Sequence, residues 1–415
     1  MKKLNNGWVF ELARFLILSN GHGEDLSGSL IGRSLQENNQ EVNAFPIVGY
    51  GSAYHKEGIK TIGKTREFTT GGIGYTSLVG RLTEIFQGQL FYLISRCISL
   101  INIVKEYDCV VVVGDVVPVT LAWLTRRPAF VYLVAYSSHY EGHLSLPWPC
   151  GLCLKSSNFI GVCSRDKFTA EDLSSQLYRK VEFLGNPFMD AVLAMPERLN
   201  LQSNNSKKIG LIPGSRRPEL DSNICLMLRV IDILSNQKTS FKELSYDMAL
   251  VSSMDNQSLT NLAAREGWHV QRSHDIAGII QLSKNQSIIN IHRNSFSEVL
   301  HKSDILLSMS GTAAEQAIGL SKPVVQLLGH GPQFTPSFAE AQRRLLGPTI
   351  FCAKGRPGEL ENLNKTSYII LDLLYKLQDD LGLRRECHLQ AYRRLGEKGG
   401  SKRISEKIVK LSENL

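Results

Sequence analysis

The sequence predicts an α/β protein built from two doubly wound domains, each with a mostly parallel β-sheet. Short apolar segments alternate with helical segments along the whole chain, which is the pattern of strand–helix–strand units. Two of these strands are followed at once by a turn of small residues and then a helix, at residues 15–28 and 305–320. In addition, 415 residues exceed what one ordinary hydrophobic core organises. We therefore expect two domains.

A change of composition marks the expected boundary. Residues 197–208 are rich in Asn, Gln, Ser and Lys, which is typical of a linker. We therefore predict a first Rossmann-like domain over residues 1–196 and a second over residues 209–385. The remaining residues, 386–415, are predicted to form a C-terminal helical segment.

The first domain begins with a buried-type strand at residues 15–19 and a glycine-rich turn. Leucine and isoleucine then recur at helical spacing from Asp25 onward, so Asp25 is a plausible N-cap. The turn is not a dinucleotide fingerprint, because the third glycine is missing and Glu24 and Asp25 occupy the turn. An oxidoreductase that uses a nicotinamide cofactor is therefore disfavoured.

Further apolar runs predict the other strands. In the first domain they are residues 42–48, 109–113, 129–134, 159–162 and 181–184, with a helix at 166–175. In the second they are residues 209–212, 247–251, 288–291, 305–307 and 324–328, with helices at 220–234 and 312–320.

Residues 78–104 form a helical region that is dense in Leu, Ile, Phe and Tyr. The simpler interpretation is core packing between layers. The alternative is a partly exposed apolar face that rests on a membrane or accepts an acyl chain.

Composition narrows the choice of partners and compartment. The net charge of +8 and pI of about 9.0 favour acidic partners such as nucleotide phosphates or anionic lipids. Because the sequence has no dense Lys/Arg tract, we expect no nucleic-acid partner. It also has no signal-peptide pattern and no apolar run of membrane-spanning length. We expect a cytoplasmic protein, and peripheral attachment to the cytoplasmic face of a membrane is compatible with these features.

Eight scattered cysteines indicate a reducing compartment. Cys150 and Cys153 form a single CxxC without a second pair, so a zinc site is not expected. A redox pair is also disfavoured, because the flanking residues do not predict a strand that leads into a helix.

Two loops of the second domain are candidate phosphate sites. Each lies between a strand and a helix, where free backbone N–H groups and the helix dipole attract anions. For the loop at 310–312 taken alone, a tight turn closed by Gly311 is an equally good interpretation. The candidate nucleotide-binding residues of the two loops are Gly214, Ser215, Arg216, Ser310, Gly311 and Thr312.

Titratable residues of the first domain are candidates for catalysis. His22 is predicted to lie in the turn after the first strand, with a pKa class suited to a general base. Asp115 follows the buried strand at 109–113, where it serves as a second candidate base or as a helix cap. Asp25 is assigned mainly to capping.

Several motifs together resemble a known family. They are Gly114-Asp115, residues 183–190 (FLGNPFMD), 211–219 (LIPGSRRPE) and 308–316 (SMSGTAAEQ). They occur in the order seen in lipid-A-disaccharide synthases, and the chain resembles a related family found in cyanobacteria and plastids. Residues 20–25 (NGHGED) and 331–336 (GPQFTP) point to that branch.

The resemblance implies a GT-B glycosyltransferase with two Rossmann-like domains, the acceptor bound by the first and the nucleotide donor by the second. Its well-known members transfer an acylated glucosamine from a UDP donor to a glycolipid, with inversion and without a metal ion or cofactor. The 213–216 and 310–312 loops would then hold UDP. The acidic residue that contacts the ribose falls on Gln316, with Glu315 one position earlier, so both remain candidates.

The resemblance also assigns roles in the first domain. His22 or Asp115 would be the base that activates the acceptor hydroxyl, and Asn20, Gly21, Gly23 and Glu24 would form the acceptor-side loop. Two alternatives remain open: a UDP-N-acetylglucosamine 2-epimerase, and a protein that binds a nucleotide sugar without turnover.

Overall fold

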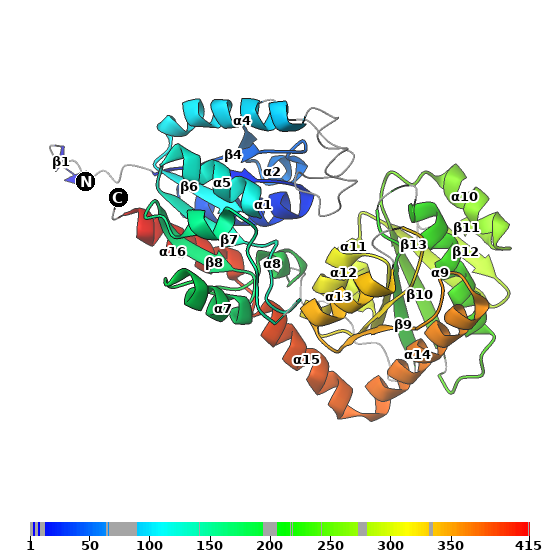
Figure 1. The fold of residues 1–415 in the computed structure, drawn as a ribbon. Coiled ribbons are helices and arrows are strands. Elements are labelled where there is room, and N and C mark those ends of the chain that lie inside the picture. The colour runs from blue at the N-terminus through cyan, green and yellow to red at the C-terminus, as the bar shows by residue number, and fades with distance from the viewer. Residues whose placement is uncertain are drawn as a thin grey trace. The chain divides into compact units, whose positions relative to one another are not determined.

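The computed structural model (Figure 1) describes residues 3–4, 7–8, 13–63, 65, 89–140, 142–193, 206–215, 217, 219–241, 243–272, 280–331, 335–413 and 415. The chain divides into two compact units. Unit 1 comprises Met1–Ala191 together with Leu395–Leu415, and unit 2 comprises Val192–Arg394. Each unit has its own β-sheet, which is parallel in unit 1 and mostly parallel in unit 2.

Unit 1 contains a six-stranded parallel sheet in the order β5-β4-β3-β6-β7-β8. The strands of the unit are β1 (Lys3–Leu4), β2 (Gly7–Trp8), β3 (Arg14–Ser19), β4 (Glu41–Pro46), β5 (Lys60–Thr61), β6 (Cys109–Val113), β7 (Ala129–Leu133) and β8 (Phe159–Ser164). Counting from β3 in chain order, the spatial order is 3-2-1-4-5-6, which is the Rossmann order. The order reverses between β3 and β6, and this place is called the switch point of unit 1.

Helices cover both faces of the unit 1 sheet. They are α1 (His22–Glu37), α2 (Ser52–Lys56), α4 (Gln89–Ile103), the short 3-10 helix η1 (Val104–Glu106), α5 (Val116–Thr125), α6 (Cys150–Leu154), α7 (Lys167–Leu177), α8 (Pro187–Leu193) and α16 (Gly400–Ser412). Helices α4, α5, α6 and α7 share a core with one face of the sheet, whereas α1, α2 and α16 share a core with the other. Because both faces are covered, the central strands are apolar throughout, as in CVVVV of β6.

Unit 2 contains an eight-stranded sheet in the order β11-β12-β13-β10-β9-β14-β15-β16. Its strands are β9 (Ser206–Ile212), β10 (Glu243–Leu250), β11 (His269–Arg272), β12 (Ile280–Lys284), β13 (Ser287–Arg293), β14 (Ile305–Ser308), β15 (Val324–Gln326) and β16 (Ile350–Cys352). The six strands from β13 to β16 in that order are parallel and repeat the 3-2-1-4-5-6 order. The switch point of unit 2 therefore lies between β9 and β14.

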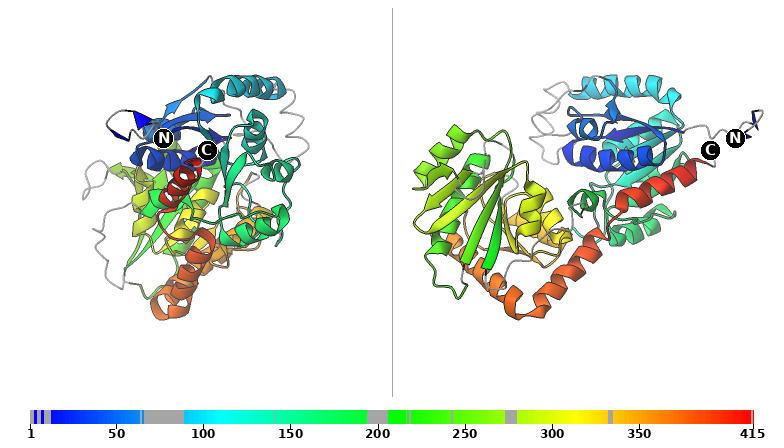
Figure 2. Two further views of the ribbon diagram at one scale, coloured as in Figure 1. Left: turned by 90° about the vertical axis from the view of Figure 1, so that its left-hand side faces the viewer. Right: turned by 180° about the vertical axis from the view of Figure 1, so that it is seen from behind.

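The helices of unit 2 are α9 (Glu219–Ser235), α10 (Asn256–Arg265), α11 (Phe296–Lys302), α12 (Gly311–Gly319), α13 (Pro336–Leu346), α14 (Leu360–Asp379) and α15 (Leu381–Leu395). Apolar side chains of α9, α10 and α14 share the main core with one face of the sheet. This core holds the largest buried residue of the unit, Trp268. Figure 2 shows the sheet from two further directions.

The chain ends on unit 1 rather than on unit 2. Helix α16 packs against α1 and β8, and Ile404 and Ile408 enter the core on that face (Figures 1 and 2). Its first turn is held by Asp190, whose carboxylate accepts hydrogen bonds from the backbone of Gly399 at 2.6 Å and Ser401 at 2.7 Å. The predicted boundaries differ here, because α15 belongs to unit 2 up to Arg394 and the rest of 386–415 belongs to unit 1.

Two predicted elements of unit 1 differ from the structure. Residues 181–184 form no strand and contribute only a single bridge, between Glu182 and Cys163. Helix α1 begins at His22, three residues before the predicted start, so the prediction of Asp25 as its N-cap was wrong. The N-cap is Gly21, because the carbonyl of Gly21 accepts a bond from the amide of Asp25 at 2.8 Å and closes an earlier turn.

Helix α4 has one buried and one exposed apolar face. Leu100 and the adjacent Val104 lie in the core, as expected from the simpler interpretation of residues 78–104. On the outer face, Phe91 is 79% exposed and Ile98 is 58% exposed. Residues 78–88 lie outside the described part of the chain. Among the described helices, none combines the length and the apolar character that a membrane span needs.

Candidate functional site

In unit 1, two loops meet at the switch point. Asn20 and Gly21 follow β3, and Gly114 and Asp115 follow β6, its parallel neighbour. The side-chain amide of Asn20 donates to both carboxylate oxygens of Asp115, at 3.3 and 3.2 Å. The structure thus brings the two predicted catalytic loops together. Ligands of open α/β sheets bind at this edge of the sheet.

Glu24 joins this cluster through two contacts. The backbone amide of Asn20 donates to Glu24 Oε2 at 2.6 Å. The carboxylate also lies against Gly114, where a Cβ atom would approach Glu24 Oε2 to 2.4 Å. Gly114 has a φ of 147°, so both its conformation and the close approach favour glycine. The strand end at Gly114 therefore has no room for a side chain because a carboxyl group occupies that space.

The two carboxyl groups have perturbed proton affinities. Burial, and then the charge of Asp115, raises the pKa of Glu24 well above its usual value. Burial also raises the pKa of Asp115, although hydrogen bonds from Val117 and Asn20 oppose the shift. Neighbouring carboxyls with raised pKa values are the arrangement in which one group holds a proton and the other accepts one.

Asp115 is also a helix cap, which is the second of the two roles that its position after a buried strand suggested. It is the N-cap of α5, and its Oδ1 accepts a bond from the backbone amide of Val117 at 2.9 Å. The hydroxyl of Tyr136 accepts a bond from the amide of Val116 at 2.9 Å. Burial and the charge of Asp115 raise the pKa of Tyr136. Asp115 can thus cap the helix and face the site at once.

The remaining predicted residues of this loop have different roles. Asp25 is buried and accepts a hydrogen bond from Ser19 Oγ at 2.6 Å, and Ser19 in turn accepts one from the hydroxyl of Tyr54 at 2.8 Å. His22 is the first residue of α1 rather than part of a free loop. Its side chain lies outside the described structure.

In unit 2, the two predicted phosphate loops also lie side by side at the switch point. Their strands, β9 and β14, are parallel neighbours, with Ile212 opposite Ser308. The backbone amide of Met309 donates to the carbonyl of Ile212 at 2.8 Å. Gly214 has a φ of 97°, and a Cβ atom there would lie 3.2 Å from the carbonyl oxygen of Met309. Glycine is favoured because of its conformation and this close approach.

The first loop is positioned by a residue that no sequence motif singled out. The side chain of Asn223, on α9, is buried and donates to the carbonyl of Pro213 at 2.8 Å. The following Gly214 is partly buried and Ser215 is exposed. Arg216, predicted to bind a diphosphate, lies outside the described residues.

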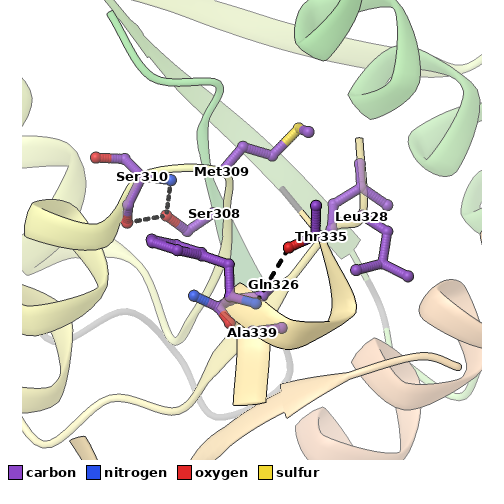
Figure 3. Close-up of a pocket in the computed structure, with 9 residues that line it drawn as sticks. Ser308, Met309, Ser310, Gln326, Leu328, Thr335 and Ala339 are labelled. Atoms are coloured by element: carbon purple, nitrogen blue, oxygen red, sulfur yellow. Dashed lines mark hydrogen bonds between the residues drawn. The ribbon is translucent and has the colours of Figure 1, made fainter. Parts of the chain in front are cut away.

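The second loop is the N-terminus of α12. Ser310 is the N-cap, and its hydroxyl accepts from the amide of Ala313 at 3.5 Å. The hydroxyl of Ser308 lies between the two backbone polar atoms of Ser310, donating to its carbonyl at 3.1 Å and accepting from its amide at 3.2 Å (Figure 3). These bonds hold the turn so that the first amides of α12, those of Gly311 and Thr312, lie at the strand end.

Both candidates for the ribose contact lie on α12. Glu315 is 7% exposed and Gln316 is 6% exposed. Gln316 Oε1 has no hydrogen-bond partner within the described structure. Helix α12 therefore buries both side chains, whereas Thr312 in its first turn is exposed.

A small cavity of about 10 Å³ lies beside Ser310 (Figure 3). Its size suits about one water molecule. It is lined by Ser308, Met309, Ser310, Gln326, Leu327, Leu328, Thr335, Phe338 and Ala339. Gln326 is buried, and its Oε1 has no hydrogen-bond partner in the described part of the chain. Thr335 caps α13 by accepting from the amide of Phe338 at 3.2 Å. Two helix N-termini thus lie at this edge of the unit.

The described residues contain no group of three or more His, Cys, Asp or Glu side chains arranged to hold a metal ion. Cys150 and Cys153 both lie on α6, are buried and are free thiols. Burial raises the pKa of both thiols, to about 12 for Cys150.

No protein-family model and no curated protein matches the sequence. Solved structures do match over nearly the full length. The calicheamicin glycosyltransferase CalG4 aligns with a TM-score of 0.60 and 14% identity, over 97% of this chain and 99% of the other. A putative UDP-N-acetylglucosamine 2-epimerase from Listeria monocytogenes aligns with a TM-score of 0.56 and 14% identity, over 98% of both chains.

A UDP-GlcNAc 2-epimerase from Neisseria meningitidis, bound to UDP-GlcNAc, aligns with a TM-score of 0.53 and 15% identity, over 97% of this chain and all of the other. At these identities the likeness concerns the fold. Two Rossmann-like units with the same strand order, aligned over their whole length with glycosyltransferases and epimerases, show that the chain has the GT-B fold.

Proposed function

We propose that this protein is a glycosyltransferase that takes its sugar from a UDP-sugar donor. The observation that carries the proposal is the pairing of two strand-to-helix loops at the switch point of unit 2. A Cβ atom at Gly214 would lie 3.2 Å from the carbonyl oxygen of Met309, and the residue after Met309, Ser310, is the N-cap of α12. A nucleotide diphosphate is the ligand whose charge and length suit such a pair.

The solved structures support the same ligand class. The epimerase from Neisseria meningitidis is bound to UDP-GlcNAc, and a Staphylococcus aureus protein of the same fold, MnaA, is a co-structure with UDP. In the present chain we propose that Gly214, Ser215, Ser310, Gly311 and Thr312 contact the diphosphate. Arg216 would neutralise its charge, and Glu315 or Gln316 would bind the ribose.

We propose a direct displacement with inversion at the anomeric carbon. The acceptor hydroxyl oxygen attacks that carbon, the bond from the carbon to the UDP oxygen breaks, and its electron pair leaves with UDP. Asp115 takes the hydroxyl proton, because the amide of Val117 and the side chain of Asn20 stabilise its ionised form. Glu24 holds a proton beside it. His22 remains the alternative base. The reaction as proposed needs the co-substrate and no resident cofactor or metal ion.

The acceptor is proposed to be a lipid or glycolipid, as the family resemblance implies. The support in unit 1 is the outer face of α4, where Phe91, Ile94, Ile98 and Ile101 follow one another at helical spacing and are 39–79% exposed. Such an unbroken apolar stripe is suited to lie at a lipid surface. Sedimentation with anionic vesicles tests this: Ile94→Ser with Ile98→Ser should release the protein into the supernatant.

The proposal is tested by measuring UDP binding and sugar transfer in separate assays. UDP should raise the melting temperature of the wild type, and His22→Ala and Asp115→Ala should keep that shift. Transfer to a panel of lipid acceptors should be lost in whichever variant lacks the base. If no uridine nucleotide shifts the melting temperature, the proposal is wrong.

A UDP-N-acetylglucosamine 2-epimerase is the second candidate, because structures of such epimerases align with this chain about as well as the glycosyltransferases do. Incubation with UDP-N-acetylglucosamine and no acceptor distinguishes the two. Formation of the 2-epimer would establish the epimerase, whereas UDP release that depends on an added acceptor would establish the transferase. Tight UDP-sugar binding without either product would indicate a non-catalytic binding protein.

A further inference from the structure

Helix α5, which follows Asp115, has a proline in its first turn. The N-cap Asp115 is followed by Val116, Val117 and Pro118 as the first three residues of the helix. The backbone amides at the start of a helix have no partner within the helix, so they are free to bind a capping group. Because proline has no N–H group, these three residues of α5 offer two amides where a helix without the proline would offer three.

Both of these amides have a partner. The amide of Val116 donates to the hydroxyl of Tyr136 at 2.9 Å, and the amide of Val117 donates to Asp115 Oδ1 at 2.9 Å. The side chain of Asn20 donates to the two carboxylate oxygens of Asp115 at 3.3 and 3.2 Å. The carboxylate of Asp115 therefore receives one backbone amide from the first turn of α5.

Other capping side chains in the described helices bind a different amide. Four further helices have such a side chain, and in all four its oxygen accepts from the amide three residues later. The pairs are Asp166–Thr169, Asp255–Ser258, Ser310–Ala313 and Thr335–Phe338. The distance is 2.8 Å for both aspartates. In α5 the equivalent residue is Pro118, which explains why Asp115 binds the amide of Val117 instead.

The missing amide affects how strongly Asp115 binds a proton. A hydrogen bond from a backbone amide favours the ionised form of a carboxyl group and so lowers its affinity for a proton. Bonds from the hydroxyl and the amide of Ser258 lower the pKa of Asp255 in this way. Asp115 lacks the equivalent bond, and burial raises its pKa. A general base is most effective when its pKa lies near the working pH, so a carboxylate held by fewer amides is the better base.

The charges around Asp115 act in the same direction. Among the described side chains, the titratable groups that face it are Glu24 on α1, Tyr136 after β7 and Cys150 on α6. All three are neutral or negative, so none of them favours a negative charge on Asp115.

We propose that Pro118 is a positioning residue that keeps Asp115 an effective base, because it withholds the amide that would otherwise bind the carboxylate. The role of Asp115 as the base rests on the proposed function. The effect of Pro118 on the proton affinity of Asp115 does not, because it follows from the capping geometry of α5.

The experiment compares the titration of Asp115 in the wild type and in Pro118→Ala. It uses carbon NMR of protein labelled at the aspartate carboxyl carbons, with Asp115→Asn to assign the signal. Alanine restores the N–H group, so Asp115 should bind its proton about tenfold more weakly, as expected for one added hydrogen bond to a charged group. The acidic limb of the pH profile of transfer should move to lower pH, and transfer at neutral pH should fall by about two- to fivefold.

Val119→Ala is the matched control, because Val119 is also buried on α5 and also loses two carbon atoms, but gains no amide. It should leave the titration of Asp115 unchanged. Pro118→Val adds the same amide and fills more of the buried space, so it should titrate like Pro118→Ala even if the alanine variant folds poorly.

An unchanged titration of Asp115 in both Pro118 variants, or an equal change in Val119→Ala, would overturn the proposal. If the titration moves as expected and the pH profile of transfer does not, the effect of Pro118 is established. That result would count against Asp115 as the base of the proposed function.

Discussion

The switch points of the two units have the same strand order and different chemistry. In both units a loop after the first strand meets a loop after the fourth, and a glycine with positive φ lies close to a neighbouring segment. This glycine is Gly114, after the fourth strand, in unit 1 and Gly214, after the first strand, in unit 2. In unit 1 the glycine makes room for the carboxyl of Glu24. In unit 2 it lies beside the Met309 carbonyl and the N-terminus of α12.

Under the proposed function, this difference lets one fold serve two tasks. Unit 1 gathers carboxyl groups whose pKa values are raised by burial, which suits proton transfer. Unit 2 presents backbone amides, serine hydroxyls and the amide side chain of Gln326 at the equivalent edge, which suits an anion. The strand order fixes where a ligand is bound, and the few side chains at the strand ends decide its charge.

The largest expected effect is on the rate of transfer, and it follows from removing a carboxyl group at the switch point of unit 1. Asp115→Asn should reduce transfer by about 100-fold or more, as for loss of a general base, while UDP still raises the melting temperature. Asparagine caps helices as well as aspartate does, so α5 should be retained. Asp255→Asn, at the exposed N-cap of α10, is the control and should leave transfer unchanged. Unchanged transfer by Asp115→Asn would leave the residue as a helix cap only.

The next effect in size is on the affinity for UDP, and it follows from a substitution at the switch point of unit 2. Gly214→Ala should weaken UDP binding by about tenfold and cost about 1–2 kcal/mol of stability, because its φ of 97° disfavours a side chain. Gly267→Ala is matched, since Gly267 also has positive φ in unit 2 but lies in the turn before β11. It should lose similar stability and keep UDP affinity. The comparison fails if both variants bind UDP equally, as measured by isothermal titration.

A smaller effect concerns the stability of unit 1, to which the C-terminal helix α16 contributes. Asp190→Ala should destabilise unit 1 by about 1 kcal/mol, because α16 loses the carboxylate that accepts from its first amides. The unfolding of unit 1, followed by hydrogen exchange of β3 and β6, should become easier while β9 and β14 keep their protection. Equal loss in both sheets would show that the units do not unfold separately.

The smallest effect is a difference in the pH dependence of stability. In the folded protein the raised pKa of Glu24 keeps its proton bound at pH values where the unfolded chain has released it. The contribution of Glu24 is therefore neutral below the unfolded pKa of about 4.3, and it becomes increasingly unfavourable as the pH rises from there to the folded pKa. Glu24→Gln, which resembles the protonated group, should gain stability relative to the wild type over that range.

Melting curves at several pH values check this, with Glu37→Gln, near the end of the same helix, as the control for an amide on α1. A constant difference between Glu24→Gln and the wild type across the range would contradict a raised pKa at Glu24.

Local sequence patterns predicted most of the central strands and the turns that follow them. The apolar runs at β3, β6, β7, β9 and β14 were located from the sequence, as were the turns that follow β3, β9 and β14. The prediction failed where a distant contact decides the outcome. Residues 181–184 are apolar except for Glu182 and contribute only one bridge, and β11 and β12 form an antiparallel addition that no local signal indicated. The spacing of residues indicated neither that α1 begins at His22 nor that Asp25 accepts a hydrogen bond from Ser19. Asp25 was therefore predicted to be a helix cap.

The sequence by itself determined the two α/β units, the strand-end positions of the candidate loops and the presence of an acidic loop in one half and glycine–serine loops in the other. These follow from hydrophobic period and turn chemistry, which act over a few residues. Only the tertiary structure decided that Glu24 lies on Gly114, that Asn223 holds Pro213, and that the chain returns to unit 1 through Asp190. Each of these depends on contacts between segments far apart in the chain, whose partners are chosen by packing and burial.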